Sequence, residues 1–506
     1  MMHSLVHFLK NSVDRVPKAE AIVQGDRRVT YEELWSTIGK VASFFKSREL
    51  EKGSRIAILL ENSPEYVVSY YGALAAGGAA IGLNTSAKAR DLLNWIHHAG
   101  ASWVIANAKH RELGAMIEGL DAQVNLLLIG DDTKLRETGR VTAKWESVLD
   151  RPSTPPVLDV FEKNDLAAII YTSGTTGNPK GVCLSHRNLA ANTQSILEYL
   201  QLTQTDRIVN VLPFYYSYGN SILHTHLAVG GTVILENSLA FPHKVVERLV
   251  EEKSTGFSGV PSTFALLLAR TDLGSYDLSS LRYLTQAGGP MPPANQERIK
   301  KILPHTRIFI MYGQTEATAR LTYLPPERLE EKLGSCGIPI PGVTIEIRDE
   351  DGNALPPHKT GEICATGENI MMGYWKAPEM TQKVLKDGWL KTGDLAHFDD
   401  DGFIFIDGRS SEMIKSGGQR ISPKEIEEVI CELEGIAEVG VVGVPDEMLG
   451  QIIKAVVVLK QGITLNAKTI QHHCLQNLAQ YKIPKLIEYA TELPKTGSGK
   501  LRRHLL

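Results

Sequence analysis

A run of glycines and hydroxyl side chains that ends in a lysine constrains this chain more than any other segment. It reads Tyr-Thr-Ser-Gly-Thr-Thr-Gly-Asn-Pro-Lys-Gly over residues 171–181, directly after the apolar stretch 166–170, which predicts a buried strand. Hydroxyls donate hydrogen bonds to phosphate oxygens, glycines let backbone N–H groups approach them, and Lys180 adds a positive charge. The sequence therefore predicts a loop that binds a nucleotide triphosphate at the end of a strand.

The spacing of this loop excludes two common nucleotide-binding motifs. After Gly174, a Walker A loop would need a second glycine followed by Lys and Ser or Thr, where this chain has Asn178 and Pro179. No Gly-x-Gly-x-x-Gly run opens a helix at this point, so the dinucleotide-binding fingerprint is missing as well.

Four further motifs follow the loop in the order of the chain. They are residues 312–316 (Tyr-Gly-Gln-Thr-Glu), 388–394 (Gly-Trp-Leu-Lys-Thr-Gly-Asp), 407–409 (Asp-Gly-Arg) and 493–500 (Leu-Pro-Lys-Thr-Gly-Ser-Gly-Lys). With the loop, they make the chain resemble the adenylate-forming superfamily, which includes acyl-CoA synthetases, nonribosomal-peptide adenylation domains and luciferase. The resemblance extends over almost the whole chain.

The resemblance implies a set of residues that bind ATP and Mg²⁺. Tyr312 would stack on adenine, Thr315 would contact the phosphate and the substrate carboxylate, Glu316 would hold Mg²⁺, Asp394 would bind the ribose, and Lys500 would be the adenylation lysine. The full expected nucleotide site comprises Thr172, Ser173, Gly174, Thr175, Thr176, Gly177, Lys180, Gly288, Gly289, Pro290, Tyr312, Gly313, Gln314, Asp394 and Arg409.

The same resemblance implies an acyl pocket, a hinge and a thiol tunnel. Gly417 and Gly418 would line the tunnel for a pantetheine arm, and Ser411 stands at the hinge, where the family usually has Asp or Lys. Arg320, just after the Thr-Glu pair, could face the pocket or solvent, and solvent is the first expectation. The acyl pocket is expected around Tyr216, Gly219, Asn220, Gly259, Ala287 and Met311.

The reaction implied is ATP-dependent activation of a carboxylic acid. The carboxylate would attack the α-phosphate and release pyrophosphate, with Lys500 stabilising charge that develops only in the transition state. A thiol would then take the acyl group, either that of coenzyme A or the phosphopantetheine arm of an acyl or peptidyl carrier protein. A luciferase-like oxygenase and a non-catalytic binding protein remain alternatives, although the latter would be expected to have lost Lys500 or Glu316.

The segment around the expected acyl pocket bears on which acid is bound. No carboxylate occurs between Val211 and Glu236, and many acyl-CoA synthetases have histidine where Tyr216 stands. Because the buried ammonium group of an amino acid would be costly without a carboxylate partner, the absence of a carboxylate here favours an acid without an α-amine. Asn220, Ser221 or backbone carbonyls could still hold a secondary amine such as that of proline, so a free-standing prolyl adenylation enzyme stays an alternative.

The order of the apolar runs predicts an α/β fold. Runs at 55–60, 103–106, 124–129, 207–212 and 232–235 alternate with amphipathic stretches, which indicates mostly parallel sheets in a large N-terminal domain. The uncharged stretch 66–83 is expected to form a helix, a turn and a strand rather than a membrane span, because Ser63 and Pro64 mark a helix start and Gly77-Gly78 a stop. The expected domains are 1–409, a hinge at 410–411, and a small mobile α+β lid at 412–506.

Composition adds limits on location and partners. The 506 residues carry a formal net charge of −4, which gives no sign of a nucleic-acid-binding surface. The five cysteines are scattered without metal-binding spacing and are expected to be reduced, which predicts a cytoplasmic protein. The N-terminus lacks the pattern of a signal peptide.

Overall fold

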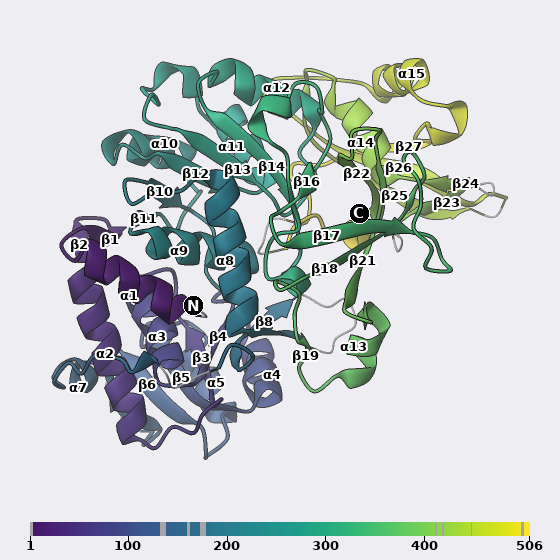
Figure 1. Cartoon of the computed structure of the whole chain (residues 1–506). Helices are drawn as coiled ribbons and strands as arrows, with labels where there is room; N and C mark the ends of the chain where they lie inside the picture. Colours follow the sequence, from purple (N-terminus) through teal and green to yellow (C-terminus); the bar gives the residue numbers. More distant parts are fainter. Residues whose placement is uncertain are drawn as a thin grey trace.

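The computed structural model describes residues 4–131, 138–158, 162–172, 179–409, 412–416, 419–446, 448–496 and 500–506. Two helix-flanked sheets form the N-terminal part of the molecule, and a smaller β-rich sheet and the C-terminal elements lie beside them (Figure 1). The α/β fold class with mostly parallel sheets is confirmed.

The first sheet contains the strand that precedes the glycine-rich loop. Its order is β19-β9-β8-β4-β3-β5-β6-β7, with parallel pairing from β8 through β4, β3 and β5 to β7, and an antiparallel β8–β9 pair. Alternate residues of β3 enter two different hydrophobic clusters, so both faces are buried. Its strands are β3 (Arg55–Leu59), β4 (Ala79–Gly82), β5 (Ala101–Asn107), β6 (Asn125–Ile129), β7 (Val141–Lys144), β8 (Leu166–Thr172), β9 (Lys180–Ser185) and β19 (Gly373–Tyr374). The helices nearby in the chain are α2 (Tyr31–Ser47), α3 (Pro64–Ala75), α4 (Ala89–Ala99), α5 (Leu113–Gly119) and α7 (Trp145–Leu149).

The second sheet brings several predicted site segments to one edge. Its order is β16-β15-β14-β13-β12-β10-β11-β1-β2, and the strands from β14 to β1 are parallel, so the carboxyl ends of β12, β13 and β14 lie together. Its strands are β1 (Glu20–Gln24), β2 (Arg27–Thr30), β10 (Arg207–Asn210), β11 (Thr232–Leu235), β12 (Gly256–Gly259), β13 (Tyr283–Gln286), β14 (Arg307–Tyr312), β15 (Thr322–Tyr323) and β16 (Ile338–Pro339). The helices are α1 (Leu5–Arg15), α8 (His186–Leu200), α9 (Ser217–Val229), α10 (Pro242–Glu251), α11 (Pro261–Arg270) and α12 (Pro293–Ile302).

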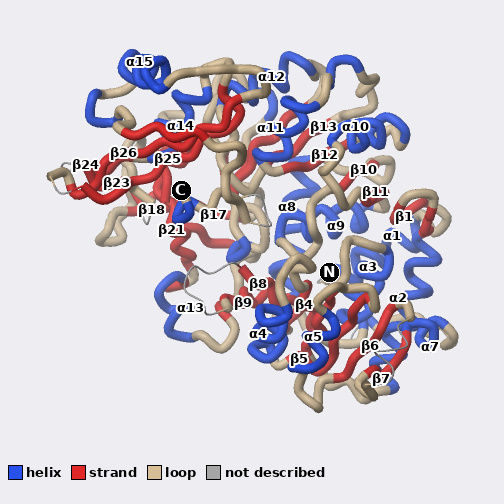
Figure 2. The backbone as a smooth tube through the Cα atoms, turned by 180° about the vertical axis from the view of Figure 1, so that it is seen from behind, coloured by secondary structure: helices blue, strands red, loops and turns tan. Residues whose placement is uncertain are grey.

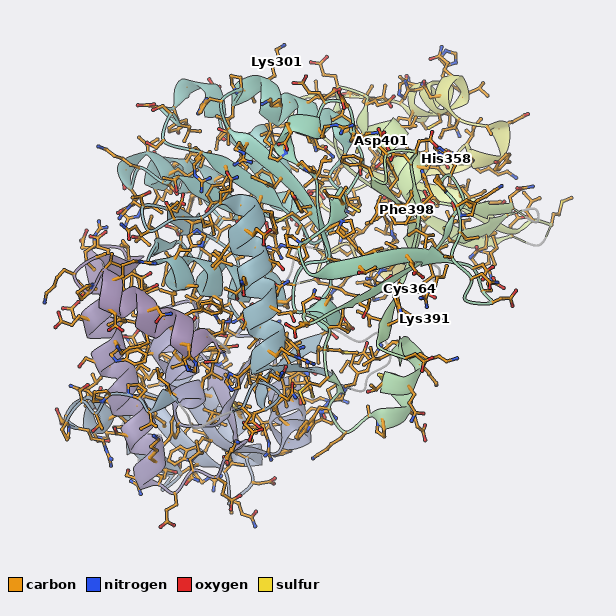
Figure 3. The ribbon with its side chains drawn as sticks, viewed as in Figure 1. Lys301, His358, Cys364, Lys391, Phe398 and Asp401 are labelled. Carbon is orange, nitrogen blue, oxygen red and sulfur yellow. The ribbon has the colours of Figure 1, made fainter. Side chains whose placement is uncertain are left out.

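A third, antiparallel sheet connects these layers to the C-terminal elements. It pairs β17 (Val343–Arg348), β18 (Gly361–Gly367), β21 (Trp389–Phe398), β20 (Leu385–Lys386) and β22 (Ile404–Arg409), with α13 (Pro378–Val384) at its end. Cys364 of β18 and Lys391 of β21 are register partners and lie next to each other in Figure 3.

The C-terminal elements have a hydrophobic core of their own, which includes Ile414, Ile426 and Val441. In both views the chain end lies between the β17–β18–β21 sheet and the β25–β26 sheet (Figures 1 and 2). The elements are β23 (Ile414–Ser416), β24 (Gln419–Ile421), α14 (Pro423–Cys431), β25 (Ile436–Asp446), β26 (Gly450–Leu459), α15 (Ala467–Asn477) and β27 (Leu486–Tyr489). The separate core agrees with the expected small C-terminal unit, whereas its boundaries at 409–412 stay a prediction.

The uncharged stretch 66–83 forms a helix and a strand, as expected. The Ser63 side chain accepts the N–H of Tyr66 at the start of α3, Pro64 follows it, and β4 begins after the two glycines. Within the described ranges, no helix is both long and apolar enough to cross a membrane.

Candidate active site

Thr315 and Glu316 stand in a short helix, η3 (Thr315–Ala317), directly after β14. The Thr315 hydroxyl lies 3.2 Å from the hydroxyl of Ser217, at the start of α9. The Tyr374 hydroxyl donates to Oε1 of Glu316 at 2.8 Å, and burial raises the pKa of this phenol, so it stays a donor. These contacts position one hydroxyl and one carboxylate at the carboxyl edge of the second sheet. Tyr374 belongs to none of the motifs, so it was not predicted.

Gly313 is required by the way the chain returns after this helix. A Cβ atom at Gly313 would lie 2.1 Å from the carbonyl oxygen of Ala319 and 2.7 Å from Cα of Arg320. Only glycine allows the strand end and the returning segment to pack so closely. Gln314, the next residue, is half-buried.

The returning segment makes a strained γ-turn. Thr318 has φ +65° and ψ −51°, and the N–H of Ala319 donates to the carbonyl of Ala317 at 2.7 Å. The buried Asn369 fixes this turn, because its amide nitrogen donates to the carbonyls of Ala317, at 3.2 Å, and Arg320, at 2.9 Å. Such strain persists only where the surroundings over-determine the conformation, and it is typical of functional sites.

The expectation that Arg320 faces solvent is wrong. Its side chain is 3% exposed, and its guanidinium carbon lies 4.2 Å from the centre of the Tyr218 ring. The reason is the γ-turn, which redirects the chain inward just before this residue.

Asp394, Tyr312 and Arg409 form one connected group. The Tyr312 hydroxyl donates to Oδ2 of Asp394 at 2.6 Å, and Nε of Arg409 donates to Oδ1 at 2.9 Å. Asp394 of β21 and Arg409 of β22 are register partners, so the third sheet sets their separation. The Asp394 charge raises the pKa of Arg409, and burial, with a further effect of Asp394, raises that of Tyr312. The carboxylate is buried, unlike that of an ordinary surface ion pair.

Lys500 reaches this group from the C-terminal elements. Its backbone N–H donates to the Thr496 hydroxyl at 3.1 Å, and its carbonyl accepts from the Thr496 N–H at 2.7 Å. Lys500 is exposed, and desolvation followed by the charge of Arg409 lowers the pKa of its ammonium group. Asp394, Glu316 and Glu412 act in the opposite sense, so the ammonium lies within electrostatic reach of two predicted site carboxylates.

The predicted phosphate-binding residues are only partly described. Thr172 ends β8 and Lys180 begins β9, and the two are partners in an antiparallel pair, as expected for the two ends of a loop. Ser173, Gly174, Thr175, Thr176 and Gly177 lie outside the described residues.

Gly288, Gly289 and Pro290 follow β13 at the same edge as the Thr-Glu pair. Gly288 has φ +89°, which favours glycine, and the carbonyl of Gly289 accepts from Nε2 of Gln286 at 2.8 Å.

The residues predicted for the acyl pocket gather around the start of α9. Tyr216 precedes this helix, and its hydroxyl accepts from Nδ2 of Asn84 at 3.3 Å. Burial raises the pKa of Tyr216 to about 12, so its hydroxyl is a neutral group at ordinary pH. Oδ1 of Asn220 accepts from Nε2 of His224 at 2.7 Å. Asn84 and His224 were not anticipated, since neither belongs to a motif.

The small residues of this region are buried and closely packed. A Cβ atom at Gly219 would lie 2.3 Å from the carbonyl oxygen of Pro213, and one at Gly259 would lie 2.9 Å from Thr263. Ala287 and Met311, at the ends of β13 and β14, are buried.

The predicted hinge residue Ser411 and the predicted tunnel residues Gly417 and Gly418 lie outside the described part of the chain. Their roles stay predictions.

Comparison with known proteins gives matches over nearly the full length. The model of a family described as AMP-binding enzyme matches residues 9–375, and that described as AMP-binding enzyme C-terminal domain matches residues 425–500. A long-chain-fatty-acid–CoA ligase of Bacillus subtilis (strain 168) is 32% identical, with 99% of this chain and 94% of that protein covered. A feruloyl-CoA synthase of an Amycolatopsis species is 33% identical, with 96% and 94% covered. The crystal structure of an anthranilate CoA ligase in complex with anthranoyl-AMP superposes with a TM-score of 0.92 at 26% identity, over 99% of this chain and 96% of that one.

Proposed function

The chain belongs to the AMP-binding enzyme family, and we propose that it activates a carboxylic acid with ATP and transfers the acyl group to the thiol of coenzyme A. It is an AMP-forming acid–thiol ligase. One observation carries the proposal: Tyr312, Asp394 and Arg409, which come from three separate motifs, form one hydrogen-bonded group around a buried carboxylate.

In the first half-reaction the residues divide between binding and charge stabilisation. Asp394 accepts hydrogen bonds from the ribose hydroxyls, while Tyr312 and the glycines 288–289 provide the surface for adenine. Thr315 donates to the reacting carboxylate or the α-phosphate. Lys500 stabilises the negative charge that accumulates as the carboxylate attacks, because a preorganised cation lowers the energy of the transition state more than that of the bound reactants. Thr172 and Lys180 hold the outer phosphates.

Glu316 suits a magnesium ion. Among the described residues no group of three or more His, Cys, Asp or Glu side chains could hold a metal by itself. Mg²⁺ is usually held by one or two carboxylates together with substrate phosphates, and Tyr374 engages only Oε1 of Glu316. The ion would neutralise charge on the departing pyrophosphate.

In the second half-reaction the thiol replaces AMP. The lid (412–506) turns relative to the domain 1–409 about the hinge 410–411 at Ser411, and Gly417 and Gly418 line the path of the pantetheine arm. Coenzyme A is favoured over a carrier protein as acceptor, because the two relatives are named as a CoA ligase and a CoA synthase. We place the enzyme in the cytoplasm, since its five cysteines, all in described segments, are free thiols.

The test separates the two half-reactions in a Lys500→Ala variant. Carboxylate-dependent ATP–pyrophosphate exchange should fall by about 100- to 1,000-fold, the range found when one transition-state donor is removed. Thioester formation from a supplied acyl-adenylate and coenzyme A should stay near the wild-type rate. Lys468→Ala, at an exposed lysine of α15, is the matched control and should change neither.

Two outcomes would contradict this assignment. Exchange that survives in Lys500→Ala would remove Lys500 from the adenylation step. A wild-type protein that forms no acyl-CoA with any fatty, aryl or amino acid, although it binds ATP, would contradict the ligase function itself.

A further inference from the structure

Arg320 is a buried cation for which the described residues supply no counterion. The contacts of its guanidinium include the sulfur of Met311 (Nε, 3.4 Å), the carbonyl oxygen of Ala319 (Nη1, 3.4 Å) and the ring of Tyr218 (Cζ to ring centre, 4.2 Å). The neutral phenol of Tyr199 also interacts with it. In the described part of the chain, no Asp or Glu forms an ion pair with it. A thioether and a carbonyl at 3.4 Å are weak acceptors.

An uncompensated guanidinium is expensive to bury. Arginine stays protonated in proteins, so it cannot escape the cost by losing its proton as a lysine can. The aromatic face of Tyr218 offsets only part of the desolvation. The remaining cost indicates that an anion completes the site.

The backbone holds Arg320 in place independently of its side chain. Asn369 donates to the Arg320 carbonyl, the strained turn at Thr318 sets the chain direction, and Gly313 packs against the Arg320 Cα. A charged group that is fixed before the ligand arrives binds it with less loss of conformational entropy. The backbone strain at Thr318 is therefore explained if the Arg320 guanidinium has to be held in one fixed orientation.

The Arg320 guanidinium lies next to the predicted acyl site. Tyr218 follows Ser217, whose hydroxyl lies 3.2 Å from that of Thr315, the residue assigned to the reacting carboxylate. Met311 belongs to the predicted acyl pocket. The guanidinium therefore lies on the acyl side of Thr315, among residues suited to the tail of the substrate.

A second polar group near the acyl site also offers donors. Oδ1 of Asn220 is occupied by His224, while Nδ2 of Asn220 donates to no described residue. The segment 211–235, which runs from the end of β10 through β11, supplies amide and hydroxyl groups but no carboxylate. Such surroundings favour an anion and oppose the ammonium group of an amino acid.

We propose that Arg320 binds a second carboxylate, so that the substrate of this ligase is a dicarboxylic acid activated at one end and held by the guanidinium at the other. The inference rests on the proposed function and names its substrate class. Arg320 is then a specificity-determining residue, because a monocarboxylic acid of the same shape would leave the cation unpaired.

The test compares diacids with their monomethyl esters, which keep the shape but remove one charge. Acyl-CoA formation is measured for succinate, glutarate, adipate and phthalate and for the monomethyl ester of each. The best diacid should exceed its ester in kcat/KM by about 10- to 100-fold, as expected for a charge-assisted hydrogen-bonded pair. A wild-type enzyme that uses the esters as well as the diacids would overturn the proposal without any variant.

Two variants then assign the preference to Arg320. Arg320→Met removes the charge at similar length and should bring the diacid-to-ester ratio near one, whereas Arg320→Lys should keep a preference. The ratio is insensitive to a general loss of activity, and a purely structural role would leave it unchanged in Arg320→Met, which would refute the assignment. If neither acid set gives a thioester, the panel of fatty, aryl and amino acids decides the proposed function. Calorimetric binding of the diacid and its ester to the ATP-loaded protein still decides the Arg320 site, because equal affinities would exclude it.

Discussion

Replacing Gly313 by alanine tests whether the close return of the chain positions Thr315 and Glu316, the proposed catalytic pair. The added Cβ would lie 2.1 Å from the Ala319 carbonyl oxygen and 2.7 Å from Cα of Arg320, and both are backbone atoms. They must move by roughly 1 Å to reach an ordinary contact distance. Overpacking of this kind costs about 1–3 kcal/mol of stability. A displacement of roughly 1 Å next to Thr315 and Glu316 should lower adenylation by about 100-fold.

The assays are carboxylate-dependent ATP–pyrophosphate exchange and the midpoint of thermal unfolding. Gly114→Ala in α5 is the matched control, because a Cβ atom there would have no neighbouring atom within 4 Å and the φ of Gly114 is negative. That variant should keep full activity and be as stable as the wild type or slightly more so. If Gly313→Ala exchanged pyrophosphate at the wild-type rate with an unchanged midpoint, the turn would have no positioning role.

Two further predictions concern the nucleotide and the buried histidines. Asp394→Asn should raise KM for ATP by about 10- to 100-fold with little change in KM for the acid, because a charged acceptor at the ribose is lost. The control Asp400→Asn, in an exposed turn, should change neither constant. Equal effects of Asp394→Asn on both substrates would contradict the assignment. Burial lowers the pKa of His224 to about 3 and that of His226 to about 4. Between pH 6 and pH 4 the unfolded chain therefore binds protons that the folded protein does not. As the pH decreases through this range, the free energy of unfolding decreases by about 1.4 kcal/mol per pH unit for each histidine. His226→Gln should reduce the proton uptake on unfolding at pH 5, measured by difference titration, by about one proton; an unchanged uptake would show that His226 is protonated in the folded state.

Local patterns in the sequence predicted much of the fold. The predicted run 232–235 has the same first and last residues as β11. The runs that begin at 55 and 207 start at the first residues of β3 and β10. These strands are short, apolar and bounded by polar turns, so their signal is local. The run 103–106 forms only the middle of β5 (Ala101–Asn107), since backbone pairing with β3 and β6 extends the strand beyond its apolar core.

The site was predictable where a motif covers it and not elsewhere. Asp394 and Arg409 lie in separate motifs and meet as register partners. Asn369 and Tyr374 support the same site from the segment between β18 and α13, and no short-range pattern marks them, because their partners are far away in the chain. Arg320 was misjudged for a related reason: a charged residue after a motif is usually exposed, and only the tertiary path of the turn buries it.

The residues that fix position 320 contact its main chain and do not depend on which side chain it carries. Asn369 bonds the carbonyl there, and Gly313 contacts the Cα, so neither depends on an arginine. If Arg320 selects the acid as proposed, a mutation at this codon changes which acids are accepted while Thr315 and Glu316, five and four residues earlier, keep their positions. Gene duplicates of such an enzyme could diverge toward new acids by single substitutions here, and an engineered library confined to this position should yield altered substrate ranges in folded protein.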